Sequence, residues 1–91
     1  MNFITTKEGT MGIRPEQLEI CAHGEGLLNG VIESVQYLGA HCDVTIRHDA
    51  DELISRRGGN CVAKPGEAVG LRAAPEVIHW FDTQSGKRMQ R

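Results

Sequence analysis

The sequence lacks every short motif that usually accompanies nucleotide binding or nucleophilic catalysis. It has no GxxxxGK[ST] phosphate loop, no GxGxxG run, no GxSxG elbow and no HExxH pair. Two glycine-rich stretches, residues 24–26 and 57–60, lead into no lysine and serine, so we interpret them as ordinary turns. The chain therefore lacks the usual sequence motifs that bind nucleotide phosphates or activate a nucleophile.

Aromatic residues are few, and neither sign of charge dominates. The chain has one tryptophan, one tyrosine and two phenylalanines, and its formal net charge is −2 with both signs mixed along the chain. Single-strand nucleic-acid binders combine basic grooves with several stacking aromatics. We therefore expect no nucleic-acid partner, and no general attraction to an anionic membrane.

Long apolar runs and regularly spaced cysteines are missing too. No stretch approaches the roughly 20 apolar residues of a bilayer-spanning helix, and residues 1–7 do not read as a secretory signal. Three irregularly spaced cysteines argue against a disulfide framework and favour a reducing, cytoplasmic location.

The cysteines and histidines do not form the close pairs typical of a zinc site. His41 and Cys42 are adjacent, and on a strand they would point to opposite faces. We interpret Cys42 as a small buried hydrophobe and predict no metal site.

The composition suits one small domain covering residues 1–91. Hydrophobic residues make up 40% of the chain, and eleven glycines favour frequent turns and short strands over long helices. We see no internal repeat and no linker that would divide the chain.

The most apolar stretch, residues 27–46, organises the rest. Cys42, Val44 and Ile46 alternate with polar residues, as in a half-buried strand. Residues 28–38 also fit helical spacing, but their Val, Ile and Tyr content favours a strand. We predict a hairpin turning at Gly39, with a bulge between Ile32 and Val35 that shifts the inward face by one residue.

Shorter segments on both sides have the same character. Pro15 is suited to begin a single helical turn, and residues 64–67 read as a tight turn. Further strands are predicted at residues 3–6, 10–14, 52–56, 68–73 and 77–82. The pattern predicts an all-β fold, a small barrel or sandwich of short antiparallel strands with one short helical turn after Pro15.

The aromatic pair near the C-terminal end has two interpretations. Trp80 or Phe81 closes the barrel from within, or the pair forms a contact surface with His79, since aromatics are enriched at interfaces. The acidic run at residues 49–52 is most simply a solvated turn.

Four separated segments together resemble a known family. They are residues 12–16 (GIRPE), 30–39 (GVIESVQYLG), 65–71 (PGEAVGL) and 79–86 (HWFDTQSG). In this order they resemble the C-terminal regulatory, transport-associated OB-like (TOBE) domain of ABC importer ATPase subunits of the maltose, glycerol-3-phosphate and polyamine type. The resemblance covers roughly residues 10–88.

The resemblance implies an OB-like barrel that acts as a non-catalytic regulatory and dimerisation domain of an importer ATP-binding subunit. ATP and Mg would belong to a nucleotide-binding domain that this chain lacks, so the chain itself is expected to be no enzyme and to hold no cofactor. The implied partners are a second ATPase subunit, the permease indirectly, and a regulatory protein or small solute. The implied location is cytoplasmic, at the inner face of the cell membrane.

Arg14 and Glu16 match the family motif by type and either pair across the Pro15 turn or take part in an interface. No catalytic, cofactor-binding or metal residue is predicted. The candidate interface or regulatory residues are Arg14, Glu16, His79, Trp80, Phe81 and Asp82.

Relatives usually have a further pair of strands before the GIRPE segment, where this chain has only residues 5–11. The barrel is therefore expected to be minimal or completed by a neighbouring chain, since an unpaired strand edge encourages dimerisation. An alternative function is an oxyanion-binding module of the molybdate-binding type, with backbone N–H groups and Ser34, Thr45 or Lys64 as ligands.

Overall fold

The computed structural model of the chain describes residues 1–6, 9–58 and 63–82. These residues form strands joined by two proline-led 3₁₀ turns, η1 (Pro15–Gln17) and η2 (Pro75–Val77). The strands are β1 (Asn2–Thr6), β2 (Gly9–Ile13), β3 (Glu19–Cys21), β4 (Leu28–Tyr37), β5 (His41–His48), β6 (Asp51–Gly58), β7 (Ala68–Arg72) and β8 (His79–Phe81). Within this part of the chain, no helix is long and apolar enough to cross a membrane.

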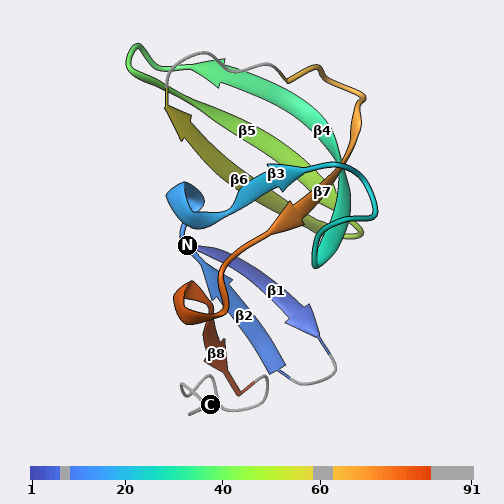
Figure 1. The fold of residues 1–91 in the computed structure, drawn as a ribbon, viewed down its shortest axis with the longest axis vertical. Coiled ribbons are helices and arrows are strands. Elements are labelled where there is room, and N and C mark those ends of the chain that lie inside the picture. The colour runs from blue at the N-terminus through green and yellow to red at the C-terminus, as the bar shows by residue number, and fades with distance from the viewer. Residues whose placement is uncertain (7–8, 59–62, 83–91) are drawn as a thin grey trace.

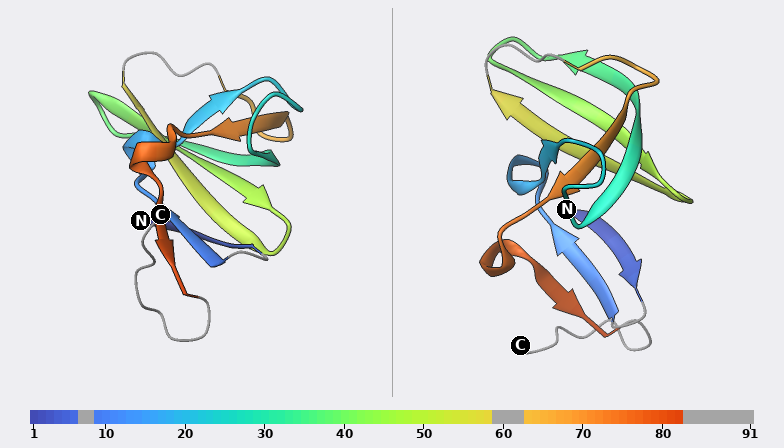
Figure 2. Two further views of the ribbon diagram at one scale, coloured as in Figure 1. Left: turned by 60° about the horizontal axis from the view of Figure 1, so that its bottom comes forward. Right: turned by 45° about the vertical axis from the view of Figure 1, so that its right-hand side comes forward.

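The strands form two antiparallel sheets, as Figure 1 shows. The small sheet has the order β1-β2-β8, and the large sheet has the order β3-β7-β4-β5-β6. The chain passes between them twice, through η1 and through η2, and Figures 1 and 2 show both turns where the sheets meet. The all-β, OB-like prediction is confirmed, with η2 as a second short turn that it did not include.

The central hairpin forms as the sequence predicted. β4 pairs with β5, and the register shifts between Ile32 and Ser34. Ile32 is buried before the shift and Val35 is half-buried after it, so the inward face changes by one residue. Gly39 adopts a φ of 79° at the turn, a conformation that glycine reaches without steric cost.

The core lies between the two sheets and is made of aliphatic side chains from almost every strand. Val44, Ile46, Leu53 and Leu71 are each 0% exposed. The other buried hydrophobic residues are Ile4, Met11, Ile13, Leu18, Ile32, Cys42 and Val69. The strands predicted at residues 10–14 and 68–73 thus turn Met11, Ile13, Val69 and Leu71 into the core.

Two buried polar side chains join β6, at the edge of the large sheet, to β1 and to the segment after η1. Asn2 donates through Nδ2 to the carbonyl oxygen of Ile54 at 2.7 Å and accepts the Ile54 N–H at 2.8 Å. Ser55 donates its hydroxyl to the carbonyl oxygen of Leu18. The Asn2 amide thus bonds the edge of β6 as another strand would.

Three features differ from the prediction. Residues 19–21, for which no strand was predicted, form β3, and β6 continues through Arg57 and Gly58, which the glycine content had placed in a turn. Cys42 is buried as predicted, but it is also disulfide-bonded, which the odd cysteine count did not suggest. The expectation of no internal repeat also fails, because β2-η1-β3 and β7-η2-β8 share one element order.

Candidate functional site

The six predicted site residues lie on the two crossing segments. Arg14 is the exposed, extended residue before η1, and Glu16 is exposed within η1. His79, Trp80 and Phe81 form β8, and exposed Asp82 follows it. Because β8 pairs with β2, with Gly12 opposite His79, the start of β8 lies near the end of β2 that leads to Arg14, whereas Phe81 lies opposite Thr10 at the other end of that pairing.

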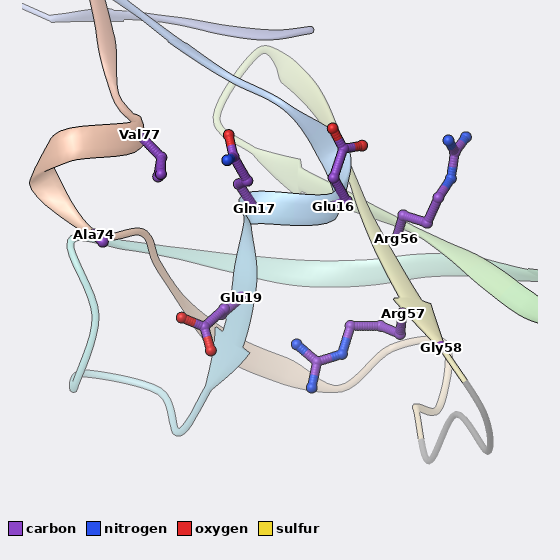
Figure 3. Close-up of a pocket in the computed structure, with 8 residues that line it drawn as sticks. All are labelled: Glu16, Gln17, Glu19, Arg56, Arg57, Gly58, Ala74 and Val77. Atoms are coloured by element: carbon purple, nitrogen blue, oxygen red, sulfur yellow. The ribbon is translucent and has the colours of Figure 1, made fainter.

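A pocket of about 420 Å³ opens at this junction. Figure 3 shows its walls, which come from η1, the start of β3, the end of β6 and η2. Its lining residues are Glu16, Gln17, Glu19, Arg56, Arg57, Gly58, Ala74 and Val77. Among the predicted site residues Glu16 lines this pocket, whereas β8 and Asp82 do not.

Arg56 is held in place by a neighbouring strand. Its Nε lies 2.9 Å from Oδ1 of Asp43 and its Nη2 lies 3.2 Å from Oδ2, so the guanidinium bonds both carboxylate oxygens. The hydrogen bond from Arg56 lowers the pKa of Asp43, and the same bond raises the pKa of Arg56. Arg56 therefore lines the pocket with its guanidinium already paired to Asp43.

Arg57 and Glu19 line the pocket from opposite edges of the large sheet. In Figure 3 the Arg57 side chain extends from β6 towards β3, whereas the Glu19 carboxylate points away from β6. No ion pair within 4.0 Å joins either of them to another described residue. The pocket thus presents charged groups of both signs.

The aromatic residues of β8 divide between the two faces of the small sheet. Trp80 packs against the core. Phe81 lies on the outer face, where its ring meets that of Phe3 edge-to-face with centroids 5.9 Å apart. A Cβ on Gly12 would lie 2.6 Å from Met1 Sδ and 2.9 Å from a ring carbon of Phe81. Glycine at this position therefore leaves the space that the Met1 and Phe81 side chains occupy.

The outer cluster, made of Met1, Phe3 and Phe81, is an apolar surface. Met1 is 49% exposed and Phe3 is 55% exposed. A second apolar point is the β4–β5 hairpin tip, where Tyr37 is 68% exposed. Such exposed apolar groups are typical of contact surfaces when they gather in one place, as they do around Phe3.

The residues considered for oxyanion binding are only partly brought together. Ser34 and Thr45 are cross-strand partners on β4 and β5. Lys64 lies in the exposed turn before β7, where its carbonyl oxygen accepts the Glu67 N–H at 3.1 Å. Among the described residues, no group of three or more His, Cys, Asp or Glu side chains is arranged to hold a metal ion.

Comparison with known proteins assigns the family. The TOBE domain family matches residues 11–81, which include both crossing segments, the central hairpin and β6. The chain belongs to the TOBE domain family. Its OB-like, all-β architecture agrees with that assignment.

The relatives of this TOBE domain are subunits of importers. The sn-glycerol-3-phosphate import ATP-binding protein UgpC of Cupriavidus metallidurans is 30% identical over 99% of the chain and 24% of its own length. The spermidine/putrescine import ATP-binding protein PotA of Desulfitobacterium hafniense is 34% identical over 85% of the chain and 22% of its own length. The Fe(3+) ions import ATP-binding protein FbpC 3 of Rhodococcus jostii is 32% identical over 72% of the chain and 20% of its own length.

The chain therefore spans about a quarter of the length of these relatives, 24% for UgpC of Cupriavidus metallidurans. All three relatives are import ATP-binding proteins, although the solutes in their names differ. The similarity therefore covers one part of these subunits, and it is shared by relatives whose names give different solutes.

Several surface residues of the TOBE domain were missed from the sequence. Phe3 was predicted only as part of a strand, no strand was predicted at Glu19, and Arg57 was assigned to a turn. Alternation along residues 51–58 was the signal that could have extended β6 to Arg57. No sequence pattern could have placed Arg57 opposite Glu19, because their strands are not adjacent in the sheet.

Proposed function

We propose that this TOBE domain is a non-catalytic contact and regulatory domain of an ABC importer ATPase subunit. The observation that carries the proposal is the family match over residues 11–81, together with relatives that are import ATP-binding proteins. In this proposal ATP and its magnesium bind outside this chain, and the chain works at the cytoplasmic face of the membrane.

The surface supports a role in protein contact. The outer cluster around Phe3 offers apolar area, and the pocket beside η1 offers Arg57 and Glu19 as charged groups without an ion-pair partner among the described residues. Protein interfaces use both apolar and charged groups of these kinds. We assign Glu16, which lines the pocket, and Phe81, which belongs to the outer cluster, as interface or regulatory residues.

Regulation would work through differential binding. The proposed partners are a second ATPase subunit, the permease through the rest of the subunit, and a regulatory protein or small solute. A partner that binds one arrangement of two subunits more tightly shifts the equilibrium towards it by the difference in binding free energy. The domain would thereby change ATP hydrolysis without touching the nucleotide.

A chimeric subunit tests the proposal. In UgpC of Cupriavidus metallidurans, the region that matches this chain is replaced by residues 1–91. We expect the chimera to hydrolyse ATP and restore glycerol-3-phosphate uptake, whereas a deletion of the same region loses uptake. Calorimetric titration of the isolated chain with Mg-ATP should show no binding. ATP binding by the isolated chain, or a chimera no better than the deletion, would refute the proposal.

A further inference from the structure

The two segments by which the chain crosses between the sheets have the same local structure, 60 residues apart. Pro15 begins η1 after β2, and Pro75 begins η2 after β7, each followed by a glutamate. The residue before each proline is extended, with φ and ψ of −69° and 146° at Arg14 and −64° and 141° at Ala74. The segments β2-η1-β3 and β7-η2-β8 therefore follow the same path from strand to turn to strand.

The strand pairing of the two segments follows the same offset. Met11 of β2 pairs with Trp80 of β8, and Leu71 of β7 pairs with Ile20 of β3. Moving each residue by 60 positions converts one pair into the other, and the same holds for all three pairs of each ladder. Beside these ladders, β1 pairs with β2 as β4 pairs with β7, so β8-β2-β1 corresponds to β3-β7-β4.

The pocket of about 420 Å³ lies where the two crossing segments meet. Gln17 of η1 and Val77 of η2 occupy corresponding positions, and both line the pocket, as Figure 3 shows. Small-molecule sites in proteins have volumes of roughly 300–1,000 Å³, a range that includes this pocket. A molecule bound here would contact both places at which the chain passes between the sheets, so its binding would favour one arrangement of the two sheets.

The wall formed by β6 offers main-chain groups as well as side chains. Asn2 bonds both the N–H and the carbonyl oxygen of Ile54, so these two groups face away from β5. Every second residue of an antiparallel strand directs its main-chain groups to the same edge, so those of Arg56 also face away from β5. No hydrogen bond to the Arg56 main chain is found at this edge among the described residues. Arg56 thus gives the pocket one main-chain donor and one main-chain acceptor.

The charged side chains of the pocket leave one cation and two anions without a close partner. The Arg56 guanidinium is already bonded to both carboxylate oxygens of Asp43. Arg57, Glu16 and Glu19 form no ion pair within 4.0 Å with any residue in the described part of the chain. A purely anionic ligand would gain from Arg57 but would meet the negative charge of both glutamates. A ligand that carries one charge of each sign is complementary to the whole set.

An apolar surface lies beside these charges. It is formed by Ala74, just before η2, and by the half-buried Val77. In Figure 3 the Val77 side chain extends from η2 towards η1, and that of Arg57 extends from β6 towards β3. Small-molecule sites combine apolar walls with a few polar groups that fix the orientation of the ligand. The pocket therefore suits a ligand with an aliphatic part as well as two opposite charges.

We propose that this pocket binds a small zwitterion, an α-amino acid with an aliphatic side chain. Its carboxylate pairs with Arg57 through charge-assisted hydrogen bonds. Its ammonium group lies on the side of Glu19, and its side chain contacts Val77. The inference rests on the proposed regulatory function, for which it names the class of small solute.

NMR titration of the isolated chain with L-leucine tests the proposal. A titration to about 10 mM approaches saturation of a site with a dissociation constant of about 1 mM. Amide shifts should change chiefly at residues 16–19, 56–58 and 74–77. Two matched analogues should bind about tenfold more weakly, because each lacks one of the charge-assisted contacts. They are isocaproate, which has no ammonium group, and isopentylamine, which has no carboxylate.

Three variants connect the binding to the charges of the pocket. Arg57→Gln should weaken leucine binding by about tenfold or more, since the bonds to the carboxylate are lost. The matched control Arg47→Gln changes an exposed arginine of β5 that does not line the pocket, and it should bind leucine as the wild type does. Glu19→Gln should reduce the preference for leucine over isocaproate, because a negative charge that opposes isocaproate is removed.

The comparison of the three ligands on the unaltered chain decides the case in which a variant does not fold. Unchanged amide shifts with leucine, equal binding of leucine and isocaproate, or an equal loss in both arginine variants would overturn the proposal. A chimera that restores uptake, although the isolated chain does not bind leucine, would reject this ligand and leave the contact function standing. Leucine binding by a chain whose chimera fails would reject the proposed function and leave the site standing.

Discussion

The large and small sheets correspond strand by strand through β3-β7-β4 and β8-β2-β1, yet they differ in how they are stabilised. The large sheet holds Val44, Ile46 and Leu53 at 0% exposed and ties its outer face with the Asp43–Arg56 ion pair. The small sheet buries Ile4 and Ile13 but leaves Phe3 55% exposed. The difference teaches that the β5–β6 hairpin, present on one side only, gives the fold much of its core.

The comparison of the two sheets also separates residues that stabilise the fold from residues available for contact with a partner. The strands that build the core have charged outer faces, and β1 of the small sheet has an uncharged outer face on which Phe3 is exposed. We expect substitutions in the large sheet to change chiefly the free energy of unfolding, and substitutions on the outer face of the small sheet to change chiefly association with a partner.

The largest effect is expected from truncation in the large sheet. Leu53→Ala should lower the free energy of unfolding by about 2–5 kcal/mol, because it removes a fully buried side chain and leaves a cavity. Urea denaturation followed by circular dichroism measures this. The matched truncation Phe3→Ala should cost about 1 kcal/mol or less, since that ring is half in solvent. Equal losses from both variants would contradict the division of roles.

A smaller effect is expected where the two sheets are joined. Asn2→Ala should lower the free energy of unfolding by about 1–3 kcal/mol, because the Ile54 N–H and carbonyl groups lose their partner at the edge of β6. Hydrogen exchange read by NMR should show faster exchange at Ile54, with little change in the centre of β5. The exposed Gln36→Ala on β4 serves as the control. Unchanged protection of the Ile54 N–H from exchange would show that the Asn2 side chain does not stabilise the edge of β6.

The smallest effect concerns the ion pair on the large sheet. The hydrogen bond from Arg56 lowers the pKa of Asp43, so this carboxylate stabilises the fold above its unfolded pKa of about 3.9. The contribution is lost as the pH falls through the lower, folded pKa. Asp43→Asn should therefore cost about 0.2–1 kcal/mol at pH 7 and progressively less below pH 4. Denaturation of both proteins between pH 7 and pH 2 measures the difference, and a gap that widens towards low pH would reverse the assignment.

Local patterns predicted most of the strands and their inward faces. The alternation at Cys42, Val44 and Ile46 placed β5, and the change of phase between Ile32 and Val35 placed the bulge, because each depends on neighbours along one or two strands. Residues 19–21 were missed because a three-residue strand is too short to display a period. Pro75 was not recognised as the start of η2, although Pro15 was assigned that role at the corresponding position.

The candidate site was predicted less completely. Glu16 was selected and does line the pocket, but Arg57 and Glu19 were not, because they come together from opposite edges of the large sheet. Phe3 and Phe81 meet only because β1 and β8 both pair with β2. Contacts of this kind depend on strand order, which a residue pattern does not encode.

By itself, the sequence determined that the chain forms short antiparallel strands with apolar inner faces, and its motifs placed it in a family. Side-chain alternation and turn preferences are local properties, so they can be read along the chain. The tertiary structure alone decided that two crossing segments 60 residues apart pair in the same way, and that the Asn2 side chain bonds the edge of β6. These features depend on which strands become neighbours in space, and that is settled only when the two sheets pack together.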